Sequence, residues 1–256
     1  MTIIYFLSPT GIDITKKCLE HYLQHLKVSS SVFSLTTNYS EQINKEYLKL
    51  ILPDDVTNPD FYAGLRHRAD HHHFDFFRKP TDLPGQGIIA FDMDSTFVEE
   101  EGVDEIARRL GISEKITALT REAMEGKIDF DTSFTRRIGM LKGTHKDILH
   151  QVCEQMTLSP GLKTILPIFK EKGFKTAIIS GGLDIFTERL KEKYQLDYAF
   201  SNSVRIQEDR LTDKITFPIM NAEKKKQTLI NLATELSICR ENIIACGDGA
   251  NDIPML

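Results

Sequence analysis

Two aspartates, Asp92 and Asp94, follow a short apolar segment at residues 88–91. A continuous apolar run of this length is typical of a buried parallel strand. Because side chains alternate along an extended chain, residues two apart project to the same side. Two adjacent carboxylates need a cation or a shared proton, and a hard ion such as Mg²⁺ meets that need. A solvated loop explains an Asp-x-Asp pair equally well, so the pair alone does not decide between them.

Two further apolar segments, residues 176–179 and 243–246, also end in polar turns. The first turn is Ser180-Gly181-Gly182, whose hydroxyl and unhindered amides before a helical pattern suit a phosphate, although a tight strand-to-helix turn explains them too. The second turn spans residues 247–252. Ligands of open parallel sheets bind outside the carboxyl ends of the strands, so we expect the turns to converge. The polar residues of the second turn are Asp248, Asn251 and Asp252.

Three lysines, Lys224, Lys225 and Lys226, open a predicted helix whose apolar stripe runs from Leu229 to Leu236. A run of charge is usually solvated, and we interpret Lys224 and Lys226 in that way. One lysine in the crevice would balance the carboxylates and hold a phosphate as a point charge.

The elements that must position these residues follow an α/β pattern from residue 81 onward. Between the first and second strands, three amphipathic stripes each end at a glycine, which predicts three short helices and a helical cap over about residues 100–158. Residues 204–206 and 215–217 predict a β-hairpin around residues 207–214. The three glycines are Gly111, Gly126 and Gly143.

Residues 1–80 predict a separate small α+β module. We expect strands at residues 3–7 and 32–35 and helices around residues 14–26 and 43–50. The polar segment at residues 80–85 is typical of a linker.

Composition excludes several classes of protein. Of the 256 residues, 41% are hydrophobic, which is typical of a globular chain. The net charge of −5 argues against a nucleic-acid partner, because a phosphate backbone requires a basic surface. No apolar run is long enough for a membrane helix, and the first residues lack the basic start of a signal peptide. The four cysteines are scattered, so we expect a cytoplasmic protein. Whether it forms a homodimer stays open.

The motifs, in their order along the chain, resemble those of the haloacid dehalogenase-type phosphohydrolases. They are DMDST, SGG, a lysine-led helix and GDGAND. Within that superfamily the chain is most similar to the phosphoserine phosphatases, through residues 99–107, 121–134, 180–186 and 247–256. The resemblance implies that residues 81–256 form a catalytic domain with a Rossmann-like parallel sheet, into which the helical cap is inserted. Residues 1–80 resemble, loosely, the small ACT-like regulatory domains of some members.

The resemblance also implies roles for individual residues. Asp92 would be the nucleophile that becomes an aspartyl-phosphate, and Asp94 the general acid and then base. Mg²⁺ would be held by Asp92, Asp248, Asp252 and the backbone carbonyl of Asp94. Lys225, 23 residues before Asp248, matches the family's lysine. The phosphate-binding residues would be Ser180, Gly181, Lys225 and Asn251.

A phosphorylated amino acid also carries an ammonium and a carboxylate. The resemblance assigns Glu101 to the ammonium and Arg137 to the carboxylate, with Met124 and Phe130 closing an apolar wall. The implied reaction is hydrolysis of O-phospho-L-serine to L-serine and phosphate, the last step of serine biosynthesis.

Two features fall outside this pattern. Family members continue past the position of Leu256 with a further helix and strand, so we expect one sheet edge of this chain to be exposed. His67, His71, His72 and His73 cluster before the linker, and we interpret them as surface residues in preference to a metal site.

Three alternative functions remain at this point. The same site would serve a phosphotransferase that uses a hydroxyl amino acid as acceptor, or a phosphatase of another small molecule. The chain would also suit an inactive amino-acid-binding protein, although the intact acidic residues argue against this. No GxGxxG or GxxxxGK[ST] motif follows a strand, which disfavours a nucleotide-binding fold.

Overall fold

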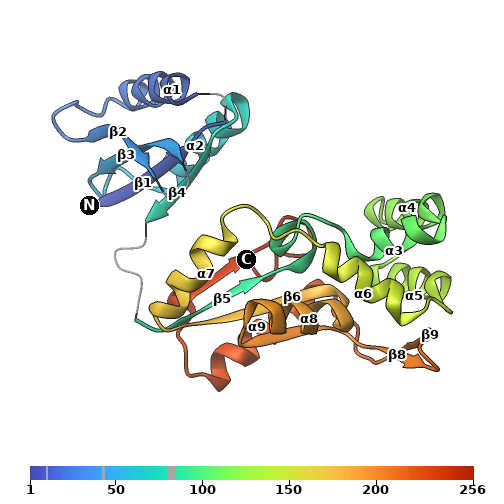
Figure 1. Cartoon of the computed structure of the whole chain (residues 1–256). Coiled ribbons are helices and arrows are strands. Elements are labelled where there is room, and N and C mark those ends of the chain that lie inside the picture. The colour runs from blue at the N-terminus through green and yellow to red at the C-terminus, as the bar shows by residue number, and fades with distance from the viewer. Residues whose placement is uncertain (10, 42–43, 80–84) are drawn as a thin grey trace. The chain divides into compact units, whose positions relative to one another are not determined.

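The computed structural model describes residues 1–256 apart from residues 10, 42–43 and 80–84 (Figure 1). The chain divides into two compact units, Met1–Leu83 and Pro84–Leu256. Most of the predicted linker at residues 80–85 lies outside the described residues. Among the described residues, no helix combines the length and the apolar character needed to cross a bilayer.

The first unit is a four-stranded antiparallel sheet with two helices. Alternate residues of the central strands, such as Ile4, Phe6, Leu48 and Leu50, form one core with residues of both helices, so both helices cover the same face. The strand order is β2-β3-β1-β4. The elements are β1 (Thr2–Leu7), α1 (Ile12–His25), β2 (Ser34–Ser40), β3 (Lys45–Leu52), α2 (Pro59–His72) and β4 (Asp75–Lys79).

The helix predicted at residues 43–50 is wrong, because this segment enters strand β3. Leu48, Leu50 and Leu52 are all fully buried, which is the period of two expected for a strand with one covered face. Ile43 lies outside the described residues. The strand predicted at residues 32–35 is found two residues later and extends to Ser40.

The second unit is built on a parallel sheet whose strand order is β10-β5-β6-β7. Ile88 and Ala90 of β5 pack with α9, whereas Ile89 and Phe91 face the opposite core with α7 and α8. The sheet is therefore covered on both faces, as its apolar strands require. Its elements are β5 (Gly87–Phe91), β6 (Phe174–Leu183), β7 (Tyr198–Asn202), β10 (Ile243–Cys246), α7 (Leu162–Glu171), α8 (Asp184–Tyr194) and α9 (Ala222–Glu235).

A helical cap follows β5, gathered beyond one end of the sheet in Figure 1. It begins after an irregular turn, Met93–Phe97, in which Asp94 and Ser95 have non-helical backbone angles, and it holds a fourth helix, α6, beyond the three predicted. The predicted hairpin is present with a tighter turn, and Leu211 exchanges hydrogen bonds of 2.8 Å with Gly143 and Thr144 after α5. The elements are α3 (Gly102–Leu110), α4 (Ser113–Met124), α5 (Phe130–Leu141), α6 (Lys146–Gln155), β8 (Val204–Gln207) and β9 (Arg210–Ile215).

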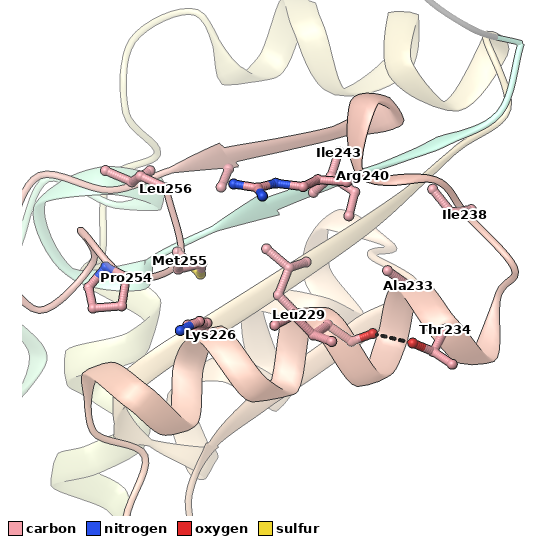
Figure 2. A pocket seen from close by; sticks show the side chains of 12 residues that line it. Lys226, Leu229, Ala233, Thr234, Ile238, Arg240, Ile243, Pro254, Met255 and Leu256 are labelled. Atoms are coloured by element: carbon pink, nitrogen blue, oxygen red, sulfur yellow. Dashed lines mark hydrogen bonds between the residues drawn. The ribbon is translucent and has the colours of Figure 1, made fainter.

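Strand β10 is one of the two outer strands of the described parallel sheet, and a groove runs beside it (Figure 2). The groove is lined by residues of α9, among them Leu229 and Ala233, by Ile243 of β10 and by the segment Pro254 to Leu256. The residues of β10 are half-buried, in contrast to the fully buried residues of β5.

Candidate active site

Asp92 lies at the carboxyl end of β5. Its N–H donates a hydrogen bond of 2.9 Å to the carbonyl of Cys246, which extends the pairing of β5 with β10 to the point where both strands end. This pairing brings the turn that holds Asp92 beside the turn that holds Asp248. Asp92 is 5% exposed, and burial raises its pKa to about 6 although Lys225 opposes the shift.

Lys225, on the first turn of α9, contacts two of the predicted acidic residues. Its Nζ lies 2.6 Å from Asp92 Oδ1 and 2.7 Å from Asp252 Oδ1, and the side chain is 1% exposed. Burial disfavours the ammonium, but the two carboxylates outweigh it and hold the pKa of Lys225 above its ordinary value. Lys226 is partly exposed, and its Nζ lies 3.7 Å from Glu223 Oε1. Of the three lysines, only Lys225 is buried among the acids.

The described residues contain one group of three acids able to surround a cation. One carboxylate oxygen from each of Asp92, Asp248 and Asp252 lies within 4.8 Å of the others. Thr96 donates a hydrogen bond of 3.0 Å to Asp248, and the Gly249 amide donates one of 3.1 Å to Asp252, which fixes both carboxylates. An all-oxygen, acidic donor set fits a hard divalent ion. The side chain of Asp94 lies outside this group.

Asp94 points to the cap instead. Its Oδ1 accepts a hydrogen bond of 2.8 Å from the amide of Gly102, the first residue of α3. Burial raises the pKa of Asp94 to about 8, and the Gly102 amide only partly offsets this effect. A raised pKa favours the protonated form, which is the form that a general acid requires.

The segment Ser180 to Gly182 is not a turn, because β6 continues through it to Leu183. The pairing of β6 with β7 shifts register between Ile179 and Leu183, so the polar residues form a bulge. The Gly182 amide donates to Ser180 Oγ at 2.9 Å. A Cβ on Gly182 would lie 3.2 Å from Asp94 Oδ2, so glycine permits the close approach of β6 to the acids.

A polar pocket joins these residues to the cap. Arg137 is mostly buried there, and its Nε has no hydrogen-bond partner among the described residues. Glu101, on the same pocket, accepts a hydrogen bond of 2.7 Å from Ser95. The lining residues are Asp92, Asp94, Glu101, Val103, Asp104, Thr120, Phe130, Arg137, Gly181, Gly182, Asp248, Gly249 and Asn251.

Met124 does not join this pocket. It is 84% exposed at the end of α4, so the structure does not support the expectation that it closes the apolar wall. Phe130 does line the pocket, stacked on Phe134 with ring centroids 6.1 Å apart.

Sequence reasoning missed Asp104 and Thr120, which both line the pocket. Burial raises the pKa of Asp104, and the Arg137 guanidinium opposes that shift, so the two side chains interact electrostatically. Asp104 stands on the first turn of α3, where acidic residues are common at any helix, and this hid its position in the sequence.

The histidine cluster lies in the other unit. His67, His71 and His72 line a groove with Cys18 and His21 of α1. Among the described residues there, no three potential ligand atoms lie as close together as those of the aspartate group. The interpretation as surface residues agrees with the exposure of His67 and His71.

Residues 89–256, which make up most of the chain, match the family of haloacid dehalogenase-like hydrolases. The chain therefore belongs to this family of hydrolases. Within the family, its relatives include curated phosphoserine phosphatases.

The phosphoserine phosphatase of Haemophilus influenzae is 41% identical over 98% of this chain and 77% of its own length. That of Archaeoglobus fulgidus is 39% identical over 75% of this chain, and the match spans only 56% of the relative. A solved haloacid dehalogenase family hydrolase from Salmonella enterica serovar Typhi has 61% identity and a TM-score of 0.90, covering 100% of this chain and 86% of its own.

Proposed function

We propose that this protein hydrolyses O-phospho-L-serine to L-serine and inorganic phosphate, the last step of serine biosynthesis. The observation that carries the proposal is the buried contact of Lys225 with Asp92, 2.6 Å long, because Asp92 also lines the pocket that holds Arg137. The proposed nucleophile thus contacts a buried lysine suited to a phosphate and lines a pocket whose arginine suits a carboxylate.

In the first step, the Asp92 carboxylate attacks phosphorus with Oδ2, the oxygen that does not accept the hydrogen bond from Lys225. The bond from phosphorus to the serine oxygen breaks, and the Asp94 carboxyl donates its proton to that oxygen. Lys225, the Ser180 hydroxyl and the Gly181 backbone stabilise the negative charge on the phosphoryl oxygens. The products of this step are L-serine and an aspartyl-phosphate.

In the second step, the Asp94 carboxylate accepts a proton from water, whose oxygen attacks phosphorus. The bond from phosphorus to the Asp92 oxygen breaks, which releases phosphate and restores the carboxylate. Asp94 thus returns to its protonated form, and protons balance over the cycle. Asn251, which lines the same pocket, would contact the phosphate.

The residues present fit a Mg²⁺ ion, which is the cofactor we propose. Asp92, Asp248 and Asp252 would hold it together with the backbone carbonyl of Asp94. When bound, the ion supplies positive charge to the phosphoryl oxygens and to the two carboxylates that Lys225 does not fully neutralise.

Selection of phosphoserine would depend on Glu101 and Arg137. The Nε of Arg137 has no hydrogen-bond partner in the described part of the chain, which supports a role in binding an anion, since a buried guanidinium nitrogen is costly without a partner. Its planar donors fit a carboxylate bidentately, and Glu101 would accept the substrate ammonium. We also propose a cytoplasmic location, which the four free cysteines support.

The test is phosphate release from O-phospho-L-serine with Mg²⁺ and then with excess EDTA. We expect release that stops with EDTA and that Asp92→Asn abolishes. Sugar phosphates run in parallel should react far more slowly. Adding homoserine should not divert the phosphoryl group, and formation of phosphohomoserine would identify a phosphotransferase. Tight binding of serine without any turnover of phosphoserine would identify an amino-acid-binding protein and overturn the proposal.

A further inference from the structure

Asn202 ends strand β7 and lies beside the bulge of β6. The ladder pairs Ile179 with Phe200 and then Leu183 with Asn202, so three residues of β6 oppose one residue of β7. A bulge of this kind removes main-chain partners from the bulged residues. The polar groups of Gly181 must therefore find another partner, because unpaired buried backbone groups are costly.

The side chain of Asn202 supplies that partner. Its Nδ2 donates a hydrogen bond of 2.8 Å to the carbonyl of Gly181, and its Oδ1 accepts one of 2.7 Å from the amide of Met220. A carbonyl only accepts and an amide only donates, so these contacts also fix which way the Asn202 amide points. Asn202 is 2% exposed. One side chain thus joins two backbone segments that no ladder connects.

Both segments lead directly to residues of the proposed phosphate site. The Gly181–Gly182 peptide is held at its carbonyl by Asn202 and at its N–H by Ser180 Oγ, 2.9 Å away. On the other side, Met220 precedes Asn221. The side chain of Asn221 accepts a hydrogen bond of 3.1 Å from the amide of Lys224 and so caps the N-terminus of α9. The first turn of α9 then presents Lys225 to Asp92.

We propose that Asn202 is a positioning residue for phosphoryl transfer. It sets the distance between the Gly181 backbone and Lys225, which bind the phosphoryl group from two sides, and it does not touch the substrate. This inference rests on the proposed function of the same site. Asn202 is suited to the task because its amide offers one donor and one acceptor on a short side chain, whereas an aspartate in the ionised form only accepts.

The experiment compares Asn202→Asp and Asn202→Ala with Thr187→Val in the complete chain. Thr187 is a matched control because it is fully buried on α8 and its hydroxyl contacts Ser201, the neighbour of Asn202, at 2.7 Å. Three quantities are measured: kcat and KM for phosphoserine, kcat for a simple aryl phosphate, and the calorimetric affinity for inorganic phosphate with Mg²⁺. All are taken at a temperature where circular dichroism shows each variant folded.

We expect both Asn202 variants to lower kcat about 10²-fold, the loss expected when a binding group shifts by roughly 1 Å. The loss should be equal for phosphoserine and the aryl phosphate, and phosphate affinity should fall with it. KM for phosphoserine should change less, since Glu101 and Arg137 remain in place. Thr187→Val should lower the melting temperature while its kcat stays near that of the wild type.

Asn202 variants with wild-type kcat and phosphate affinity would overturn the proposal, as would an equal loss of kcat in Thr187→Val. A loss confined to phosphoserine would place Asn202 in the amino-acid clamp and also overturn it. If Asn202→Asp does not fold, Asn202→Ala gives the same comparison without adding a charge. If the wild type releases no phosphate from phosphoserine, the proposed function fails, but phosphate affinity still tests Asn202.

Discussion

Ser95 Oγ donates a hydrogen bond to Glu101 Oε1 over 2.7 Å. Ser95 directly follows Asp94 and has a φ of 52°, a left-handed conformation that turns the chain sharply after the end of β5. Glu101 is the residue that precedes α3, the first helix of the cap. The bond therefore ties the turn that holds the proposed general acid to the carboxylate proposed to bind the substrate ammonium.

Ser95→Ala should leave Glu101 without this orienting contact. The net worth of such a hydrogen bond, about 0.5–1.5 kcal/mol, corresponds to a rise of roughly two- to twelvefold in KM for phosphoserine. We expect a smaller change in kcat, because Asp94 keeps its bond to Gly102. Steady-state kinetics measure both, with the exposed Ser29→Ala as control. A fall in kcat with constant KM would contradict the role given to Ser95.

Arg137→Ala should impair phosphoserine selectively. Hydrogen bonds to a charged group contribute about 1.5–3 kcal/mol, so kcat/KM should fall on the order of 10- to 150-fold. An aryl phosphate without a carboxylate should lose far less. Arg136→Ala is the matched control, because the neighbouring side chain is exposed. Equal losses with both substrates would remove Arg137 from the clamp.

Asp248→Asn should weaken the binding of Mg²⁺. The variant removes one charge from the group of three carboxylates while leaving Lys225 bound to Asp92 and Asp252. We expect phosphate release to need at least about tenfold more Mg²⁺, the loss typical of a disturbed metal site. Asp213→Asn, an exposed aspartate paired with Lys142, should leave the Mg²⁺ dependence unchanged. An unaltered dependence in Asp248→Asn would place the ion elsewhere.

Asp197 predicts a pH-dependent part of the stability. Burial disfavours its carboxylate, but hydrogen bonds of 2.9 Å from the Thr176 amide and hydroxyl, with Lys175 at 2.9 Å, hold its pKa below the ordinary 3.8. A carboxyl group whose pKa is lowered by folding stabilises the fold at pH values above its pKa in the unfolded chain. This stabilisation is lost as the pH falls through the pKa of the folded state.

Asp197→Asn should therefore lower the free energy of unfolding by about 1–3 kcal/mol at neutral pH. The difference from the wild type should shrink below pH 3.8, where the wild-type carboxylate becomes protonated. Urea titrations at several pH values, followed by circular dichroism, measure it. Asp213→Asn, whose ion pair is exposed, should change stability little. A difference that grows toward acid pH would contradict this account.

Much of the parallel sheet could be predicted because its strands are continuous apolar runs. Residues 88–91, 176–179 and 243–246 carry this signal, and all three lie in parallel strands. Since parallel strands end at one edge, the meeting of Asp92 with Asp248 also followed from the pattern. The choice of Lys225 depended on the family interval, because nothing local separates it from Lys224 or Lys226.

Other features have no local signal. Tyr47, Leu48 and Leu50 fit a helical stripe and a strand equally well, and pairing with β1 decided for the strand. Ser180 and the glycines after it have turn composition, yet they continue β6 as a bulge. The role of Asn202 depends on two backbone groups that are distant in sequence, so it emerges only from the folded chain.

The most direct test of the account is to locate the phosphoryl group on the enzyme. Rapidly quenched turnover of phosphoserine, followed by borohydride reduction and peptide mass spectrometry, would mark the residue that formed an acyl-phosphate. We predict that the reduced residue is Asp92 and that Asp92→Asn shows no reduced peptide. Reduction at another carboxylate, or turnover with no phosphorylated residue at all, would contradict the proposal that Asp92 is the nucleophile.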